Sequence, residues 1–184
     1  KNNFRLDIFP EYKSHRKKVR KPIIVKPLKE YMFHNYETLT YPNLEGDDVC
    51  GIFATQSLNK DKVVILSGDK DLRTIPGIHH FIHDESTEIV NETIANYNFM
   101  YQTLVGDMTD GFAGCPSIGG VKASRILANK KDLPEMWEAV VKEYEKQGLD
   151  ENYALTQARL ARILRASDWD SKKKKPILWR PHAN

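Results

Sequence analysis

The chain has 184 residues, of which 40% are hydrophobic and 29% are charged, and its formal net charge is +3. This length and composition favour one soluble domain with a hydrophobic core and exclude a disordered chain. No apolar run approaches the roughly 18 residues that a membrane span needs, and no secretory signal pattern is present. We therefore expect a cytoplasmic protein that does not bind membranes.

Positive charge is concentrated near the amino-terminal end. Between positions 13 and 29 the chain carries basic residues and no acidic one, namely Lys13, Arg16, Lys17, Lys18, Arg20, Lys21, Lys26 and Lys29. The charge alone leaves two interpretations open: a solvated helix face or flexible arm, and a surface that follows a phosphate backbone. A second basic run, Lys172 to Lys175, is interpreted as a solvated connector.

The first acidic cluster opens a predicted helix. The stretch "NLEGDDVCG" places Glu45, Asp47 and Asp48 at the start of a helical pattern over residues 45–58. Like charges about 4 Å apart repel by roughly 4 kcal/mol at an effective dielectric constant near 20. A metal ion among the carboxylates would offset that repulsion.

Two predicted strands follow, at 62–68 and 79–84, where β-branched and aromatic residues lie between turn formers. The first strand runs into Asp69 and Asp71, so both carboxylates come at a strand end, where open α/β sheets bind ligands. A lone Asp-x-Asp also occurs in ordinary surface turns. The histidines of the second strand share one short segment, which disfavours a zinc site there.

A third acidic pair follows the next predicted helix, at 91–105. Asp107 and Asp110 are three residues apart and can therefore face the same way, although an Asx turn at a helix end would explain them as well. Taken together, the three acidic groups place carboxylates at the ends of core elements. Such oxygen ligands favour Mg²⁺ or Mn²⁺, and two ions of this kind can act on a phosphodiester.

A glycine-rich stretch, "GFAGCPSIGGVKAS", comes next. Gly114, Gly119 and Gly120 bracket a short loop before a helix that carries Lys122. Glycines let backbone amides approach an anion, and the start of a helix supplies free N–H groups. The pattern predicts a phosphate-binding loop, with an ordinary loop as the alternative.

The last third of the chain is predicted to be helical, with apolar residues at three and four spacing over 132–147 and 151–164. Trp137, Trp169 and Trp179 are predicted to be core or docking residues. The closing "ILWRP" is predicted to pin the end of the chain onto the sheet. Strands that alternate with helices and then give way to a helical section predict an α/β fold.

Several stretches, taken in order, resemble the flap-endonuclease family. They are "NFRLDIFPEYKSHRKKVRKP", "LEGDDVCGIFA", "VVILSGDKDLRTIPG", "LVGDMTDGFAGCPSIGGVKASRIL" and "ARILRASDWD…ILWRP". The similarity is greatest to the 5′→3′ exonucleases of T-seven-like podoviruses and extends to the 5′-nuclease domain of bacterial DNA polymerase I. It implies one PIN-like 5′-nuclease domain with a parallel sheet, divided into a basic arch region at 1–35, an α/β core at 36–105, and a helix-two-turn-helix element with further helices at 106–184.

The resemblance also implies roles for individual residues. The metal ligands implied are Glu45, Asp47 and Asp48 for a first ion and Asp71, Asp107 and Asp110 for a second, with Asp69 completing the network. The catalytic residues implied are Lys13, Arg16, Asp71 and Asp107. The DNA contacts implied are Lys13, Arg16, Lys17, Arg20, Lys21, Gly114, Ser117, Gly119, Gly120 and Lys122. The glycine loop is also expected to bind a potassium ion through its backbone carbonyls.

The activity implied is that of a 5′-3′ exonuclease that requires Mg²⁺ or Mn²⁺ and hydrolyses phosphodiesters at the 5′ ends of duplex DNA. Flap cutting and removal of RNA primers paired to DNA are implied as further activities. Because the basic side chains would contact the backbone and not base edges, binding should tolerate sequence and weaken with salt. In a bacteriophage, the enzyme would act in DNA replication or host DNA breakdown, in the host cytoplasm.

The beginning of the chain departs from the family pattern. Family members place leading strands and two further metal-binding acids upstream of the position of Asn3. We therefore expect that an amino-terminal segment is removed, is disordered, or is supplied by a separate polypeptide. Two other classes stay open: a DNA-binding remnant that cannot cut, and an Asp-x-Asp nucleotide-sugar transferase, which a failure to bind DNA would favour.

Overall fold

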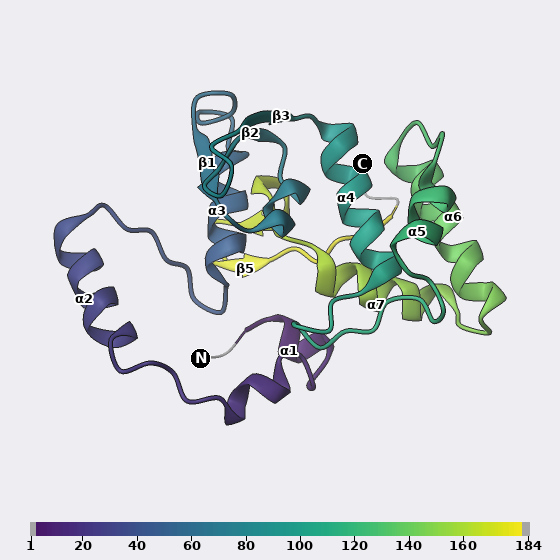
Figure 1. Cartoon of the computed structure of the whole chain (residues 1–184), viewed down its shortest axis with the longest axis horizontal. Helices are drawn as coiled ribbons and strands as arrows, with labels where there is room; N and C mark the ends of the chain where they lie inside the picture. Colours follow the sequence, from purple (N-terminus) through teal and green to yellow (C-terminus); the bar gives the residue numbers. More distant parts are fainter. Residues whose placement is uncertain (1–2, 182–184) are drawn as a thin grey trace.

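The computed structural model of the chain describes residues 3–181, and of Lys17 and Lys18 it describes the backbone alone (Figure 1). The α-helices are α1 (Arg5–Ile8), α2 (Val25–Asn35), α3 (Gly46–Ala54), α4 (Glu92–Val105), α5 (Gly120–Leu127), α6 (Leu133–Lys146) and α7 (Glu151–Ala161). The strands are β1 (Val64–Ser67), β2 (Gly77–Phe81), β3 (Thr87–Val90), β4 (Trp169–Asp170) and β5 (Lys175–Pro176). Short 3₁₀ helices are η1 (Ser14–Lys18), η2 (Lys70–Thr74) and η3 (Ala166–Asp168).

The main sheet has three strands in the order β1, β2, β3. β1 and β2 are parallel, with Val64 opposite Ile78, whereas β2 and β3 are antiparallel, with Ile78 opposite Ile89. The predicted α/β class is confirmed, but the sheet is mixed and not wholly parallel. β3 was not predicted, because its four residues are too few to establish an alternating pattern.

The helical half of the molecule packs around α4, which contacts α5, α6 and α7 (Figure 1). Side-chain caps fix where the helices begin: Asn91 accepts from the Ile94 N–H, and Asp132 does the same for Glu135 at the start of α6. Buried residues of α4, α5, α6 and α7 make up most of the largest hydrophobic cluster. Between α4 and α6, the Tyr144 hydroxyl donates to the Thr103 carbonyl at 2.6 Å. These contacts hold α4 in place. The carboxyl end of α4 in turn positions part of the candidate site.

Two predicted helices end earlier than expected. α3 stops at Ala54, because Thr55 turns its hydroxyl back onto the Gly51 carbonyl at 2.7 Å and a polar loop follows. α7 stops at Ala161. The residues beyond α7 leave the helix because Ile163 and Leu164 pack into the clusters around α3.

The end of the chain packs differently from the prediction. All of the tryptophans are buried, as expected. Trp179, however, lies edge-on to Phe99 and Trp137, with ring centroids 5.2 and 5.0 Å away. The "ILWRP" segment is therefore pinned to the helical core and not to the sheet, because two aromatic neighbours there bury the large indole.

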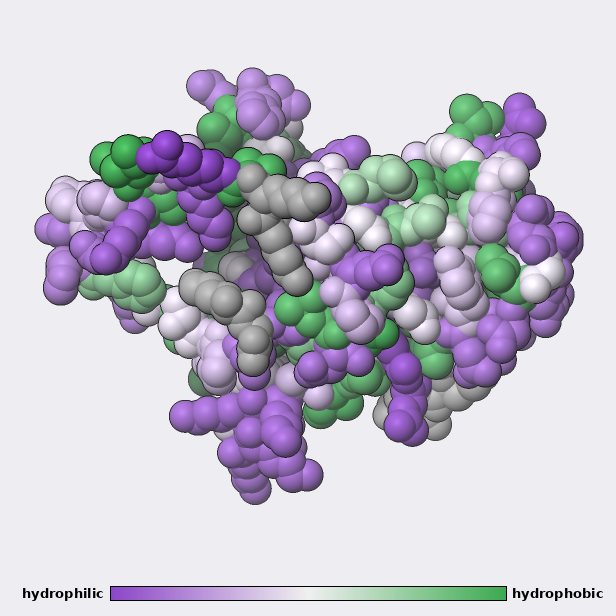
Figure 2. Space-filling view, turned by 90° about the horizontal axis from the view of Figure 1, so that it is seen from below, coloured by the Kyte–Doolittle hydropathy of each residue, from purple (hydrophilic) through white to green (hydrophobic). Residues whose placement is uncertain are grey.

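The segment around α2 projects from the body of the molecule as an arch (Figure 1). None of the residues of α2 is buried. Large apolar side chains are exposed along the arch, including Ile23, Ile24, Leu28, Tyr31 and Phe33. Figure 2 shows hydrophobic and hydrophilic side chains side by side on the lobe at the left, where α2 lies.

Two glycines allow the end of α4 to meet the glycine loop. Gly106 has φ +74°, and a Cβ there would lie 2.4 Å from the Ala113 carbonyl carbon, while one on Gly114 would lie 2.4 Å from the Gly106 nitrogen. We expect Gly106→Ala to lower the free energy of unfolding by about 3 kcal/mol, through backbone strain and overpacking. Urea denaturation would measure it. Gly46→Ala is the matched control, since its Cβ would meet nothing within 4 Å, and an equal loss there would contradict the explanation.

None of the helices in the described part of the chain has both the length and the apolar character that crossing a membrane requires.

Candidate active site

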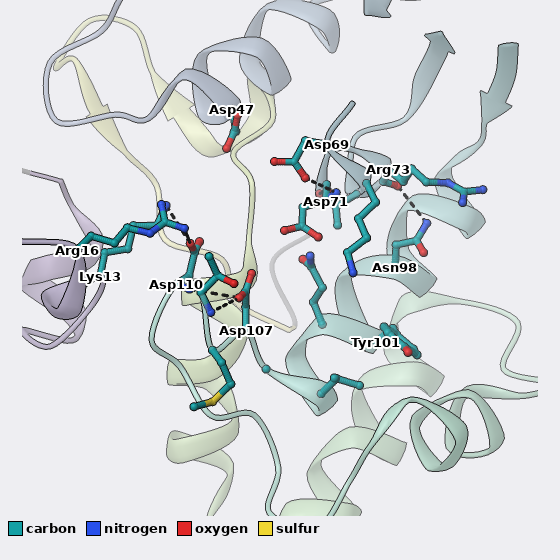
Figure 3. Close-up of a pocket in the computed structure, with 17 residues that line it drawn as sticks. Lys13, Arg16, Asp47, Asp69, Asp71, Arg73, Asn98, Tyr101, Asp107 and Asp110 are labelled. Carbon is teal, nitrogen blue, oxygen red and sulfur yellow. Dashed lines mark hydrogen bonds and ion pairs between the residues drawn. The ribbon is translucent and has the colours of Figure 1, made fainter. Parts of the chain in front are cut away.

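A cavity of about 720 Å³ lies between the end of β1, the end of α4 and the amino-terminal segment. The acids that line it come from separate parts of the chain and are Asp47, Asp69, Asp71, Asp107 and Asp110. Figure 3 shows the carboxylates between Lys13 and Arg16 on one side and Arg73 and Asn98 on the other. The fold thus brings most of the predicted acidic residues to one hollow.

Asp69 and Asp71 reach the cavity because β1 ends directly before them. Asp69 has an extended backbone and caps η2, with its Oδ1 accepting from the Asp71 N–H at 2.9 Å. This local bond orders the Asp-x-Asp turn. The turn has the geometry of an ordinary surface turn, which the pattern also allowed. It follows the carboxyl end of β1, which is where open α/β sheets bind ligands.

Asp107 and Asp110 are held by the turn that follows α4. The Asp107 Oδ1 accepts from the N–H groups of Thr109 at 2.6 Å and Asp110 at 3.2 Å, and Asp107 also pairs with Phe112 through the backbone. The Asx turn is therefore present, and both side chains line the cavity. Asp110 pairs with Arg16 and Lys13, whereas the charge of Asp107 acts more strongly on Asp71 than that of Asp110 does.

Burial, followed by the charges of neighbouring acids, raises the pKa of two carboxyls in the cavity. For Asp47, in the first turn of α3, burial, followed by the charges of Asp69 and Glu45, raises the pKa to about 6. For Asp71, burial and then the charges of Asp69 and Asp107 raise the pKa. Carboxylates that repel one another in this way would be stabilised by a cation between them.

The pKa of Asp47 gives a prediction for the metal-free protein. Because its folded pKa lies above the ordinary 3.8, the native state holds more protons than the unfolded state between about pH 4 and 6, so stability falls as pH rises through that range. We expect Asp47→Asn to unfold with a free energy about 2 kcal/mol higher than the unsubstituted chain at pH 7.5, and equal to it below about pH 4. Urea titrations in EDTA at both pH values measure this. A variant less stable at pH 7.5 would contradict it.

Glu45 is linked to Asp110 by a basic side chain and by a phenol that contact both carboxylates. The Lys13 Nζ lies 2.8 Å from the Glu45 Oε1 and 3.2 Å from the Asp110 Oδ1, and an Arg16 nitrogen lies 3.1 Å from the same Asp110 oxygen. The Tyr12 hydroxyl lies 3.0 Å from Glu45 and 2.9 Å from Asp110. Burial, together with both carboxylates, raises the pKa of Tyr12, so it stays a neutral phenol that links the two acids.

Asp48 has a different environment from the other predicted acids. It is fully buried and lines neither this cavity nor the smaller one beneath it. Both of its oxygens accept from the Arg5 guanidinium at 2.8 Å, and they also accept from the N–H groups of Leu164 and Glu45. Its carboxylate is occupied by internal partners, so the structure does not bring it to the cavity.

The predicted DNA contacts outside the cavity lie in two places. Arg20 and Lys21 are exposed on the segment that leads to α2, and the Lys17 side chain lies outside the described part of the structure. In the glycine loop, Ser117 has φ +61°, and its carbonyl accepts from the Lys122 Nζ at 2.9 Å. The backbone N–H of Gly114 donates to Gln157, and Gly119 caps α5, where Gly120 approaches Tyr101 closely.

Sequence reasoning missed part of the cavity wall. Asn98, Tyr101 and Gln102 face the cavity from α4, and Lys70 and Arg73 face it from η2. The spacing of the three α4 residues could have been recognised as a polar stripe on a helix otherwise buried on its other sides. Tyr12 and Arg5 were missed as partners of the acids because their contacts join residues far apart in sequence.

The donor set suits a hard divalent ion that keeps much of its water. All the acidic side chains in the cavity offer oxygen, as Mg²⁺ and Mn²⁺ prefer. Among residues 3–181, however, no three His, Cys, Asp and Glu side chains are close enough to surround an ion directly. Magnesium commonly binds through only one or two carboxylates with the rest of its shell supplied by water and phosphate, which fits this open arrangement.

The histidines of β2 have ordinary partners. His79 is buried and its Nε2 pairs with the Ile75 carbonyl, while His80 pairs with Thr87 on the neighbouring strand. They therefore face structural neighbours and not one another.

An α/β domain that gathers carboxylates at a strand end, beside basic side chains, suits an enzyme that acts on phosphodiesters with divalent ions. The family described as "5′-3′ exonuclease, N-terminal resolvase-like domain" matches residues 1–100. The exodeoxyribonuclease of Enterobacteria phage T3 is 30% identical, over 95% of this chain and 68% of that protein, and the exonuclease of Escherichia phage T7 is 31% identical, over 94% and 68%. The chain belongs to the 5′-3′ exonuclease family, which confirms the predicted resemblance.

The fold comparison agrees. The flap endonuclease of bacteriophage T5, in a crystal structure described as a complex with DNA and metal ions, superposes with a TM-score of 0.65 at 18% identity, over 89% of this chain and 71% of that one. A second structure of the T5 5′-exonuclease, described as binding zinc ions, also gives a TM-score of 0.65, at 18% identity, over 88% and 70%. The chain therefore shares the fold of these 5′-nucleases.

Proposed function

We propose that the chain hydrolyses phosphodiesters at the 5′ ends of duplex DNA, as a 5′-3′ exonuclease that requires divalent metal ions. The observation that carries this proposal is the cavity in which Asp47, Asp71 and Asp107 converge beside Lys13 and Arg16. Family membership supports the reaction class. The related phage enzymes and the T5 structure with DNA and metal ions support the choice of substrate and cofactor.

The cavity acids would hold Mg²⁺ or Mn²⁺, two ions being the expectation. When bound, such ions polarise a phosphodiester and lower the pKa of a water molecule. Glu45, Asp47, Asp69, Asp71, Asp107 and Asp110 are the proposed ligands, directly or through water. For Asp48 we propose a supporting part, because its pairing with Arg5 fixes the first turn of α3, from which Asp47 projects.

Lys13 and Arg16 have a distinct part in the proposal. In the structure they neutralise Glu45 and Asp110 at the rim of the cavity. Once cations occupy the acids, these side chains become available to orient the scissile phosphate. Arg16 is well placed for this because its side chain is 45% exposed, while the Lys13 side chain is 19% exposed.

Binding to the rest of the substrate would use the exposed bases of the arch and the glycine loop, with a potassium ion at the loop carbonyls. We include 5′ flaps and RNA–DNA hybrids as substrates, and phage DNA replication or host DNA breakdown as the setting. These contacts address the phosphate backbone, so affinity should depend weakly on sequence and strongly on salt.

The test is release of nucleotides from 5′-labelled duplex DNA by the 184-residue chain with Mg²⁺, Mn²⁺ or EDTA. We expect release with either metal and none with EDTA. Salt-dependent binding without release under any divalent ion would instead show a DNA-binding chain that needs an upstream segment. Absence of both binding and release would overturn the proposal.

A further inference from the structure

The lysine run near the end of the chain was predicted to be a solvated connector. Its lysines are exposed, but they belong to a β-hairpin. β4 and β5 pair as a hairpin, with Trp169 opposite Pro176 and Asp170 opposite Lys175. Lys172, Lys173 and Lys174 form its turn, and Lys175 begins β5. All of these lysines are exposed. We call residues 169–176 the lysine hairpin.

The turn is ordered by the side chain of Asp170. The Asp170 Oδ1 accepts from the N–H groups of Lys172 at 3.0 Å and Lys173 at 2.9 Å. Lys174 has φ +52°, a left-handed conformation for which a turn would ordinarily use glycine or asparagine. Turn geometry alone therefore does not favour lysine at position 174.

The hairpin is anchored firmly at its base. Trp169 is buried in a cluster with Phe4, Ile52 and Leu164. Its ring stacks on Tyr41, in the segment that returns from the arch to α3, with ring centroids 5.0 Å apart. The Ile177 N–H also donates to the Asp168 carbonyl at 2.8 Å. Charge on the turn is thus presented from a fixed base that adjoins both α3 and the arch.

The positive charge of the turn is largely uncompensated. Within the described residues, the carboxylate that pairs with a lysine of the turn is Asp170, 3.8 Å from the Lys173 Nζ, and that lysine side chain is 78% exposed. Like-charged ammonium groups on so short a turn repel one another. An extended polyanion would relieve that repulsion by contacting several of them at once.

The base of the hairpin adjoins the helix that carries one of the cavity acids. Ile52, on which Trp169 packs, follows the buried Asp48 by one turn and therefore lies on the inward face of α3, about 8 Å along the helix from Asp47. A duplex that extends past α3 from the cavity would bring phosphates toward the lysine turn, since each strand carries one roughly every 3.4 Å along its axis.

We propose that the lysine hairpin binds the phosphate backbone of duplex DNA, as a contact separate from the arch and the glycine loop. The inference rests on the proposed function, because it places the duplex end at the carboxylate cavity. The hairpin would add affinity and salt dependence without sequence preference, since lysine ammonium groups contact phosphate as point charges.

The test measures binding of a labelled duplex by fluorescence anisotropy in EDTA, over a range of salt concentrations. The variant has Gln at positions 172, 173, 174 and 175. We expect its affinity to fall about tenfold or more, and the slope of log affinity against log salt to become shallower by about 2 to 4. A second variant with Arg at the same positions is expected to bind like the unsubstituted chain, because it keeps the charge.

The matched control removes the same charge elsewhere, by Lys→Gln at Lys60, Lys62, Lys142 and Lys146, which do not line the cavity. An equal effect in the control would mean that affinity depends on the total positive charge and not on the hairpin, and it would overturn the proposal. Unchanged binding by the hairpin variant would overturn it too, while leaving the proposed function standing. Polyglutamate is the second probe. If the hairpin variant lost as much affinity for polyglutamate as for duplex DNA, the result would point to acidic proteins as the partner instead. No binding by the unsubstituted chain would overturn the hairpin proposal, whereas the proposed function would be overturned only if metal-dependent release were absent as well.

Discussion

Asp71→Asn is expected to reduce metal-dependent release of nucleotides from 5′-labelled duplex DNA by about 100-fold or more. Asp71 lies in the cavity between Asp69 and Asp107, where burial and then the charges of these two acids raise its pKa. Asparagine keeps the shape but removes the negative charge that would hold a cation there. A metal ion contributes several kcal/mol of transition-state stabilisation, and each 1.4 kcal/mol corresponds to a factor of about ten in rate.

Asp84→Asn is the matched control for this prediction. Asp84 is exposed in the turn between β2 and β3 and does not line the cavity. We expect full activity in this variant, and calorimetric titration with Mn²⁺ should show weaker binding for Asp71→Asn alone. In EDTA, Asp71→Asn should be at least as stable as the unsubstituted chain, because it relieves like-charge repulsion. Full activity with unchanged Mn²⁺ affinity would remove Asp71 from the proposed site.

The location of the site could be predicted because its acids follow regular elements. Asp69 and Asp71 come straight after a β-branched strand, and Asp107 and Asp110 follow a long helical pattern. Elements of this kind are readable from local periodicity, and the end of a parallel strand is a known ligand position. The convergence of the groups on one cavity therefore followed from their order along the chain.

The distinction between Asp47 and Asp48 could not be predicted in the same way. Adjacent residues on a helix point about 100° apart, so one of the pair can reach the cavity while the other faces the interior. Which one turns inward depends on Arg5, more than forty positions away, and on the Leu164 N–H beyond α7. Sequence patterns describe neighbours along the chain, and these partners are neighbours only in the fold.

The same limit explains the charged rim of the cavity. The basic run at 13–29 looked uniform in sequence, but the structure separates Lys13 and Arg16, which pair with Glu45 and Asp110, from Arg20 and Lys21, which are exposed. The left-handed conformation of Lys13, at φ +53°, begins η1 and sets this difference. Composition therefore gave the sign of the charge but not which side chains meet the acids.

Arg5→Ala is expected to lower the free energy of unfolding by about 3 to 5 kcal/mol, measured by urea denaturation at pH 7. Arg5 is 3% exposed and donates to both Asp48 oxygens and to the carbonyls of Leu160 and Arg162, so it joins α1, α3 and the end of α7. Its removal leaves a fully buried carboxylate without a cation. A loss below about 1 kcal/mol would contradict this account.

Two comparisons separate the burial of Asp48 from the mere loss of an ion pair. Lys26→Ala breaks the exposed pair with Glu30, 3.9 Å long, and should change stability by at most about 0.5 kcal/mol, because water screens such pairs. Arg5→Met combined with Asp48→Leu should cost less than Arg5→Ala alone, since no buried charge then lacks a partner. If the double variant were instead as unstable as the sum of both single changes, Arg5 would act through packing and its carbonyl contacts, and the first turn of α3 would not depend on this pair.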